Sequence, residues 1–215
     1  MSSEKTSVPE ASVYRLSLYH CYLGDLIRKG VIGRITSRQL AEELDIREET
    51  VRRDMSFMGG GGRPGAGYEM SSLFAALTEF LGLSDDYPVA EVGTAQMLAA
   101  LKVVFPPYSY GVKPIAYYSE LPEDVGKSID NVRIRHITEI LSREESLSVD
   151  VALVACSPGW AQVTVDLLGQ AGVRGVLLLT PVTKLNSPEG MEITYMRMPC
   201  DIKALAHRCG VVVGA

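Results

Sequence analysis

One turn in the middle of the chain has residues that could hold a phosphate group. An apolar run, residues 89–92, leads into Gly93 and then into the helical pattern TAQML. A buried strand that turns through glycine into a helix presents backbone N–H groups to a pyrophosphate, and dinucleotide-binding domains place three glycines there with the spacing GxGxxG. Only Gly93 is present, since Ala95 and Leu98 stand at the second and third positions. The turn predicts a dinucleotide-type site that lacks two of its glycines.

Each departure from that pattern has a physical consequence. The second glycine lets the backbone approach a pyrophosphate, where Ala95 adds a methyl group, and the third allows close helix-to-strand packing, where Leu98 is far bulkier. The acid that usually holds the ribose is also absent, because the second strand ends in Ser119 and Glu120 comes one position late. Binding of NAD(H) stays open at this site, whose candidate residues are Gly93, Thr94, Ala95, Gln96, Met97, Leu98 and Ser119.

Residues 35–58, ITSRQLAEELDIREETVRRDMSFM, have the pattern of two short helices joined by a tight turn. Thr36 or Ser37 can cap the first helix, and residues 45–46 supply the turn. The second helix begins at about Arg47 and has two apolar positions one turn apart on its inner face, which are Val51 and Met55. This arrangement predicts a helix-turn-helix.

Polar side chains around these two helices suit a nucleic acid. The second helix of a helix-turn-helix enters the major groove, where Arg pairs with guanine and Ser or Thr holds phosphates. An ordinary solvated helical hairpin would also explain the charges. The candidate DNA contacts are Ser37, Arg38, Arg47, Thr50, Arg52, Arg53 and Ser56, with Arg63 in the segment that follows.

That next segment, GGGGRPGAGY over residues 59–68, favours DNA binding over a solvated hairpin. It holds six glycines in ten residues and is too flexible for a core element. A phosphate-binding loop is excluded, because no Lys-Ser or Lys-Thr follows and no buried strand precedes it. A glycine-rich hairpin after a recognition helix is what a winged helix requires, with Arg63 able to enter the minor groove.

Composition limits the class of protein. The net charge of −5 argues against nonspecific coating of nucleic acid, but residues 14–68 carry nine Arg or Lys against seven Asp or Glu. No signal peptide or membrane segment is expected, so the sequence predicts a soluble, cytoplasmic protein. The four cysteines form no CxxC pair, so neither a metal site nor a disulfide framework is expected, and buried, inert thiols are the simplest interpretation.

The rest of the chain alternates strand and helix patterns. A helix over MSSLFAALTEFLGL, capped by Ser71 or Ser72 and ending near Gly82, is predicted to join the domains. Four apolar strands follow, PVAEVGT, KPIAYYS, VDVALVAC and VRGVLLLT, with helical stretches between them. Such a pattern is typical of a doubly wound parallel sheet of the Rossmann type.

The expected organisation is therefore an α/β chain of five parts. They are a flexible N-terminus over 1–12, a winged helix-turn-helix domain over 13–70, a linking helix over 71–87, a Rossmann-like sensor domain over 88–198 and a C-terminal helix over 199–215. No enzyme site is expected, since His136 lies in a basic strand-like stretch and no catalytic triad, HExxH motif or carboxylate pair is convincingly placed. Cys156 and Trp160 are more simply packing residues.

Several motifs occur together in an almost gap-free run from about Val13 to Val212: LYHCYL, SRQLAEEL, ETVRRDMSFMG, the glycine-rich wing, LPEDVGKSI, and TPV followed by PEG. In these motifs the chain resembles the Rex family of redox-sensing transcriptional repressors. The resemblance implies a homodimer that reads a palindromic operator, with the C-terminal helix swapped onto the partner. It implies that NADH releases DNA and NAD+ permits binding. Carried over, the DNA contacts are Arg47, Arg52, Arg53, Ser56 and Arg63, and the dinucleotide positions are Gly93 to Leu98 and Ser119.

The chain departs from the family pattern mainly in the sensing half. The family has GxGxxG at the first turn, an acid where Ser119 falls, and an acidic approach to its last helix where this chain has YMRMPCDIKALAHRC. The hypothesis is a Rex-like repressor whose NAD(H) response is weakened, altered or lost. An alternative is a nucleotide- or CoA-binding α/β protein whose helical domain serves assembly, which would not need the Arg-rich helix and wing. A third hypothesis is thiol sensing through Cys156 or Cys200.

Overall fold

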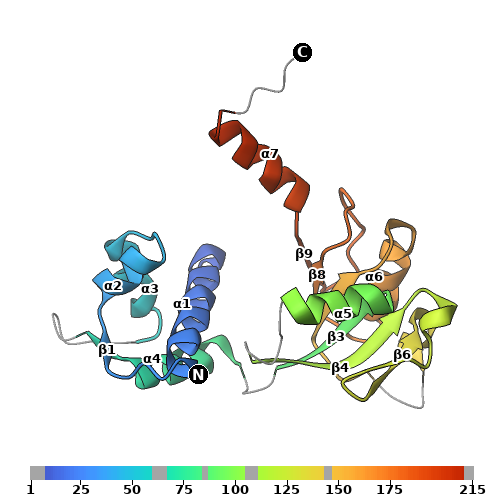
Figure 1. Cartoon of the computed structure of the whole chain (residues 1–215), viewed down its shortest axis with the longest axis horizontal. Coiled ribbons are helices and arrows are strands. Elements are labelled where there is room, and N and C mark those ends of the chain that lie inside the picture. The colour runs from blue at the N-terminus through green and yellow to red at the C-terminus, as the bar shows by residue number, and fades with distance from the viewer. Residues whose placement is uncertain (1–7, 60–66, 84–86, 105–110, 143–146, 211–215) are drawn as a thin grey trace. The chain divides into compact units, whose positions relative to one another are not determined.

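The computed structural model describes residues 8–59, 67–83, 87–104, 111–142 and 147–210. The chain divides into two compact units, Met1–Asp86 and Tyr87–Ala215, and each has a hydrophobic core of its own (Figure 1). The first unit is mostly helical, whereas the second is built on a sheet. This division agrees with the α/β class expected from the sequence.

The first unit packs four helices around one core. They are α1 (Glu10–Arg28), α2 (Ser37–Glu43), α3 (Glu48–Ser56) and α4 (Met70–Leu81), and the strands β1 (Arg34–Ile35) and β2 (Tyr68–Glu69) pair antiparallel beside them. Val51 and Met55 of α3 are buried, as the apolar spacing predicts. Each helix contributes to the same buried cluster, for example Leu16, Leu40, Val51 and Leu77.

Two boundaries expected for this unit are corrected. α1 begins at Glu10, so residues 10–12 are helical, and Ser12 is buried. α4 is part of the core and not only a link between domains, because it packs along α1. There the His20 ring stacks on Phe74 with centroids 4.3 Å apart, and His20 Nε2 lies 3.0 Å from Thr78 Oγ1.

The cap of α4 also differs from expectation. The carboxylate of Glu69 accepts the backbone N–H groups of Ser71 and Ser72 at 3.2 and 2.6 Å, so Glu69 is the cap and the prediction of a serine cap is wrong. A longer acidic side chain serves equally well, since a helix N-terminus favours any acceptor that carries negative charge. At the other end, Gly82 adopts the left-handed conformation with φ 66° and ends the helix, as predicted.

The second unit contains a seven-stranded sheet. Its strands are β3 (Tyr87–Gly93), β4 (Val112–Ser119), β5 (Ser128–Ile129), β6 (Val132–His136), β7 (Val151–Ala155), β8 (Gly175–Leu178) and β9 (Glu192–Tyr195). The order is β5-β6-β4-β3-β7-β8-β9. Without β5, the parallel strands follow the order 3-2-1-4-5-6 of dinucleotide-binding domains. β5 pairs antiparallel with β6 at one edge, so the sheet is mostly parallel, in agreement with the doubly wound, Rossmann-like sheet expected from the sequence.

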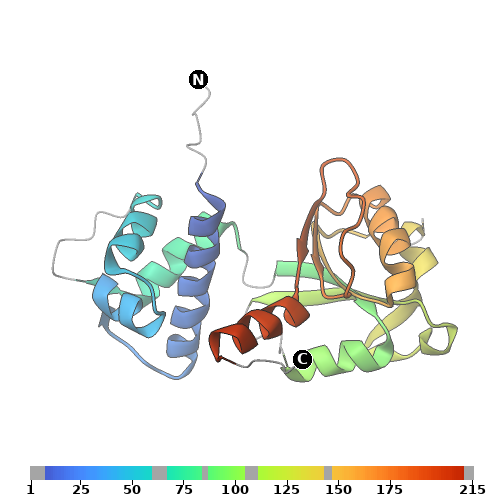
Figure 2. The same ribbon diagram turned by 90° about the horizontal axis from the view of Figure 1, so that it is seen from above.

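Helices α5 (Ala95–Val104) and α6 (Ala161–Gln170) lie on opposite faces of this sheet (Figure 2). α6 covers the larger core, and α5 places Leu98 against Tyr117 and Ile134. On the α5 side, Leu153 of β7 and Leu177 of β8 are only half-buried. The described residues therefore leave part of that face open.

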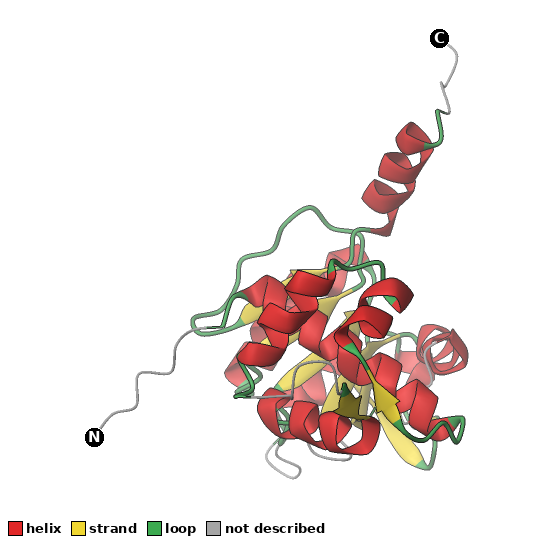
Figure 3. Cartoon of the chain, turned by 90° about the vertical axis from the view of Figure 1, so that its left-hand side faces the viewer, coloured by secondary structure: helices red, strands yellow, loops and turns green. Residues whose placement is uncertain are grey.

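The chain continues from β9 into α7 (Met198–Arg208), none of whose residues is buried (Figure 1, Figure 3). Met198, Ile202 and Leu205, spaced for one helix face, are 61%, 63% and 53% exposed. The expectation of buried thiols holds for Cys156 alone, since the other three cysteines, Cys21, Cys200 and Cys209, are exposed. Among the described helices, none combines the length and apolar character needed to span a membrane.

Candidate functional site

The helix-turn-helix is fixed by local hydrogen bonds that its sequence encodes. Thr36 caps α2: its Oγ1 accepts the N–H of Gln39 at 3.1 Å, while the Gln39 side chain accepts the N–H of Thr36 at 2.9 Å. Between the helices, Asp45 takes the left-handed conformation with φ 51°, and the N–H of Ile46 donates to Ala41 O at 2.9 Å. These bonds close α2 and set the direction in which α3 leaves the turn.

An ion pair between half-buried Arg15 and a buried carboxylate then ties α3 to α1. Asp54, which is fully buried, accepts two bonds from the Arg15 guanidinium at 2.6 and 2.7 Å and one from Tyr19 Oη at 2.9 Å. Burial works to raise the pKa of Asp54, but the hydrogen bonds from Arg15 and Tyr19 outweigh it and lower the pKa below its ordinary value. The charged network holds the inner face of α3, so its outer face is presented in one orientation.

The outer face of α3 and the flank of α2 carry the predicted DNA contacts. Arg38, Arg47, Arg52, Arg53 and Ser56 are exposed, whereas Ser37 and Thr50 are half-buried. Arg63 lies outside the described residues. Seven of the eight candidate side chains thus lie on or beside α2 and α3, and the position of the eighth is not described.

The arginines of this surface differ in whether they form ion pairs with acidic residues of the chain. Arg38 donates to Glu42 at 2.8 Å, and Arg52 donates to Glu48 at 2.5 Å. Glu48 also accepts from Ser37 Oγ at 3.0 Å, so Ser37 helps to hold this exposed pair. Within the described part of the chain, the guanidinium groups of Arg47 and Arg53 have no hydrogen bond or ion pair. They are the cations most available to a phosphate or a base edge.

Only the base of the predicted wing lies in the described residues. β1 and β2 form its two strands, and Arg34 donates to Gly67 O at 2.5 Å across them. Gly67 has φ 65°, and a Cβ at that position would lie 2.9 Å from Ile35 O. Glycine is therefore required where the wing returns to the domain.

The predicted sensor turn lies at the carboxyl end of β3, the central strand at which the order of the sheet reverses. Such a switch point is where open α/β sheets bind ligands. Gly93 pairs with Ala155 of β7, and a Cβ on Gly93 would come within 3.2 Å of Ala155 O. Close approach of the two strands accounts for this glycine without any ligand.

The remaining residues of the turn serve the helix that follows it. Thr94 Oγ1 accepts the N–H of Met97 at 3.2 Å, and Leu98 is fully buried against β4 and β6. Gln96 and Met97 are exposed. Leu98 thus fills, with its side chain, the helix-to-strand contact that a third glycine would otherwise permit.

The structure adds Asp124, a residue that sequence reasoning missed. Asp124 ends the 3-10 turn Pro122–Asp124, and its Oδ2 accepts the N–H of Ala95, the first residue of α5, at 2.8 Å. Ser119 Oγ donates to the same oxygen at 2.9 Å, and Lys127 Nζ donates to Oδ1 at 2.7 Å. Burial works to raise the pKa of Asp124, yet these donors lower it. The sequence did contain one signal for this residue, because Asp124 is followed three positions later by Lys127, just after the second predicted strand.

A second carboxylate lies at the same edge of the sheet. Glu120, 5% exposed, accepts the N–H of Ser157 at 2.8 Å through Oε1, and its Oε2 has no hydrogen-bond partner among the described residues. Cys156 beside it is buried, and burial raises the pKa of its thiol, which disfavours the reactive thiolate. Trp160 is half-buried and meets His136 edge-on, with ring centroids 6.1 Å apart, so it packs against protein.

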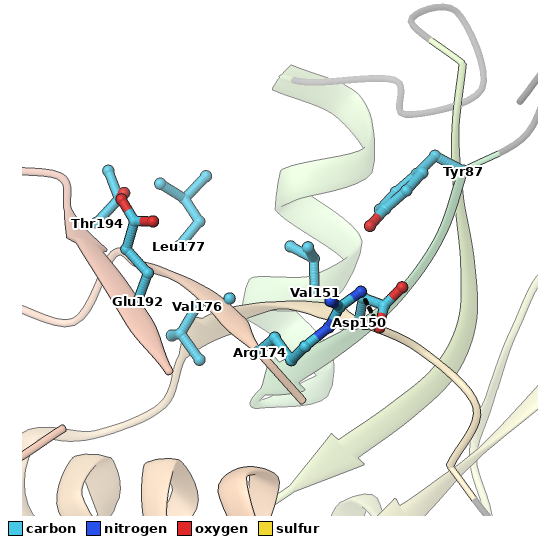
Figure 4. A pocket seen from close by; sticks show the side chains of 9 residues that line it. Tyr87, Asp150, Val151, Arg174, Val176, Leu177, Glu192 and Thr194 are labelled. Atoms are coloured by element: carbon cyan, nitrogen blue, oxygen red, sulfur yellow. Dashed lines mark hydrogen bonds and ion pairs between the residues drawn. The ribbon is translucent and has the colours of Figure 1, made fainter. Parts of the chain in front are cut away.

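An open groove of about 460 Å³ lies at the opposite, amino end of the strands (Figure 4). Val151 and Leu177 give it an apolar floor, and an exposed ion pair between Arg174 and Asp150, 2.8 Å apart, lies at its rim. Tyr87, Glu192 and Thr194 also line it. The described residues contain no group of three or more His, Cys, Asp or Glu side chains placed to hold a metal ion.

Comparison with known proteins gives similarity over both units. A family described as "Putative DNA-binding protein N-terminus" matches residues 7–56, and one described as "CoA binding domain" matches residues 86–182. The redox-sensing transcriptional repressor Rex of Staphylococcus aureus, strains JH9 and Newman, is 30% identical over 207 residues, which cover 94% of this chain and 95% of the relative.

Solved structures of RSP, a Rex-family repressor, share the fold. Its crystal structure has a TM-score of 0.75 at 24% identity and covers 95% of both chains. RSP in complex with beta-NAD+ and operator DNA has a TM-score of 0.79 at 25% identity and covers 95% of this chain and 94% of the other. RSP in complex with beta-NADH has a TM-score of 0.78 at 23% identity and covers 95% of both chains.

Proposed function

Since the chain belongs to the Rex family of redox-sensing transcriptional repressors, we propose that it binds operator DNA as a homodimer and responds weakly or not at all to NAD(H). The observation that carries this proposal is a contrast in the structure. The helix-turn-helix keeps exposed arginines, whereas the backbone donor at the start of α5 is already bonded to Asp124.

DNA recognition is supported by the geometry of α3. The Asp54 network fixes its inner face, and Arg47, Arg53 and Ser56 stand on the exposed side. Arg53 is proposed to reach a base edge, because a recognition helix places such side chains in the major groove. A helical domain used only for assembly would not need these cations, so this arrangement favours a repressor over the alternative of a nucleotide- or CoA-binding assembly protein.

A weakened NAD(H) response is supported by the first turn. Gly93 is explained by strand packing, Leu98 by the core, and Ser119 by its bond to Asp124. None of these three residues is left to contact a ribose or a pyrophosphate. We propose that NAD(H) in its usual pose would lose both its ribose acceptor and its first N–H donor here.

Dimerisation is supported by α7. Its apolar row, Met198, Ile202 and Leu205, is more than half exposed, and an exposed apolar face of this kind marks an interaction surface. The open half of the sheet face, with Leu177 and Val151 in the groove, offers an apolar surface on a second copy. We propose that α7 of each protomer packs on the other, as the family resemblance implies.

An operator-binding experiment tests this function. The full chain is mixed with a labelled palindromic operator of the Rex type and with a scrambled duplex, and gel shifts are recorded without nucleotide, with NAD+ and with NADH. We expect specific retention of the palindrome and little change on adding NADH. Equal retention of both duplexes would contradict the repressor function, and full release by NADH would contradict the weakened response.

An Ile202→Asp variant tests the proposed role of α7 in dimerisation. It is expected to elute as a monomer in size-exclusion chromatography and to bind the palindrome more weakly.

A further inference from the structure

The N-terminus of α5 already holds an anion supplied by the chain. The N–H of Ala95, the first residue of this ten-residue helix, donates to Asp124 Oδ2 at 2.8 Å. The N–H of Met97 donates to Thr94 Oγ1 at 3.2 Å. Free N–H groups in the first turn of a helix are the groups that bind a phosphate, together with the positive end of the helix dipole. Protein atoms take two of them here.

The Asp124 carboxylate is built into this position. The residue is 4% exposed, and both of its oxygens are occupied, Oδ2 by Ala95 N and Ser119 Oγ and Oδ1 by Lys127 Nζ. Ser119 Oγ in turn accepts the N–H of Leu121 at 3.1 Å, which fixes the direction of its own donation. Charge-assisted bonds of this kind are shorter and stronger than neutral ones, so the carboxylate is held by three partners at once.

A phosphate cannot share this site with Asp124. Both groups are anions that need the same Ala95 N–H, and like charges at hydrogen-bonding distance repel strongly in a poorly solvated site. Glu120, buried at the same edge of the sheet, adds a second acidic group near the switch point. The edge at which a pyrophosphate would bind therefore presents two buried carboxylates, one of which occupies the first N–H of α5.

We propose that the Asp124 carboxylate takes the place of a ligand phosphate at the N-terminus of α5. It blocks dinucleotide binding at the first turn and stabilises the turn in the absence of a ligand. Lys127 supplies the balancing charge, so the closed turn remains stable without a ligand. This inference rests on the proposed role of the turn as the sensor of the repressor. It assigns the altered response to one side chain, which lies outside the GxGxxG pattern.

Removal of that side chain tests the proposal. In an Asp124→Ala variant, Ala95 N–H and the Lys127 ammonium become available to a phosphate. The matched control is Glu123→Ala, which removes the same charge from an exposed neighbour in the same 3-10 turn. Binding of NADH, ADP-ribose and inorganic pyrophosphate to the full-length proteins is measured by titration calorimetry. We expect Asp124→Ala to bind NADH and ADP-ribose at least tenfold more tightly than wild type and Glu123→Ala.

Two outcomes would overturn the proposal. One is wild-type protein that binds NADH as tightly as Asp124→Ala, and the other is an equal gain in Glu123→Ala, which would reduce the effect to net charge. Asp124→Asn keeps the side-chain volume and covers the case in which Asp124→Ala fails to fold. A folded Asp124→Asn that gains no affinity for either ligand would also count against the proposal.

Gel shifts with the same proteins separate this inference from the proposed function. If wild type and Asp124→Ala both retain the palindromic operator, and only Asp124→Ala loses it when NADH is added, both proposals are supported. If neither protein binds the operator but Asp124→Ala gains NADH affinity, the repressor function fails while the assignment of Asp124 stands.

Discussion

Helix α3 and the start of α5 differ in what the described part of the chain leaves unpaired. At α3, the buried side is satisfied by the Asp54 network while Arg47 and Arg53 have no partner within the described residues. At α5, Asp124 accepts the first N–H from within the chain. Both regions have sequence patterns of ligand-binding elements, but only the first keeps cations available to a ligand, whereas the second has its first N–H bonded to a carboxylate of the chain. A motif predicts a site only when its polar groups are not already bonded to the protein.

The largest expected effect is a loss of stability in the first unit. Asp54→Ala leaves the buried Tyr19 hydroxyl without its acceptor and leaves the Arg15 guanidinium with Ser12 Oγ in place of a carboxylate, so we expect the first unit to lose about 3 kcal/mol of stability. Urea denaturation followed by circular dichroism measures this loss. The control is Asp25→Ala, which removes an exposed ion pair with Arg28 and should cost less than about 1 kcal/mol. Similar losses in both variants would show that the Asp54 network does not anchor α3.

The next effect belongs to the second unit and depends on pH. Glu91 of β3 is 3% exposed, and burial raises its pKa to about 7 from 4.5, against the opposing effect of Lys102. The folded state then binds a proton more tightly than the unfolded state, so the contribution of Glu91 to stability falls as pH rises from about 4.5 to 7. Glu91→Gln removes this titration. The free energy of unfolding of the variant minus that of wild type should therefore be about 3 kcal/mol larger at pH 8 than at pH 4.

Urea unfolding of wild type and Glu91→Gln at both pH values measures this difference. The comparison is made within each pH, so contributions of other titrating groups cancel between the two proteins. A stability difference that does not change with pH would show that Glu91 is ionised in the folded protein at neutral pH.

A smaller effect sharpens the assignment of the DNA surface. Arg53→Ala removes an exposed cation of α3 that has no ion pair with any described residue, and we expect about 10- to 100-fold weaker operator binding, equivalent to about 1–3 kcal/mol. The dependence of affinity on salt should also decrease if Arg53 contacts a phosphate. Fluorescence anisotropy at several salt concentrations measures both. Arg133→Ala, which removes an exposed arginine from β6 of the second unit, should leave operator affinity unchanged.

The smallest effect tests the local element that begins the helix-turn-helix. Thr36→Ala removes the side-chain half of the capping box of α2 and should cost about 1 kcal/mol. Thermal unfolding measures the shift. Thr36→Ser keeps the hydroxyl and should remain within about 0.5 kcal/mol of wild type. If both variants unfold alike, the cap contributes nothing to the stability of the first unit.

Much of the fold follows from local spacing. The helix pair over residues 37–56, the buried positions Val51 and Met55 and four of the strands are readable because apolar residues recur with the periods of helix and strand. The strands β5 and β9 were not predicted, since β5 has only two residues and β9, Glu192–Tyr195, lacks the continuous apolar run that marks β8. The role of α4 was also misplaced, because an amphipathic helix does not show in its sequence which element its apolar face meets.

The sequence by itself determined the helix-turn-helix, its outward-facing arginines, the absence of two glycines from the first turn and the absence of the ribose acid from the end of the second strand. It could do so because these features depend on residue type and spacing within a few positions. Only the tertiary structure decided what fills that turn. Asp124 reaches Ala95 across 29 positions of chain, after β4 has paired beside β3 and the 3-10 turn has aimed the carboxylate at the N-terminus of α5. A bond over that separation depends on strand order and backbone direction, which no local pattern encodes.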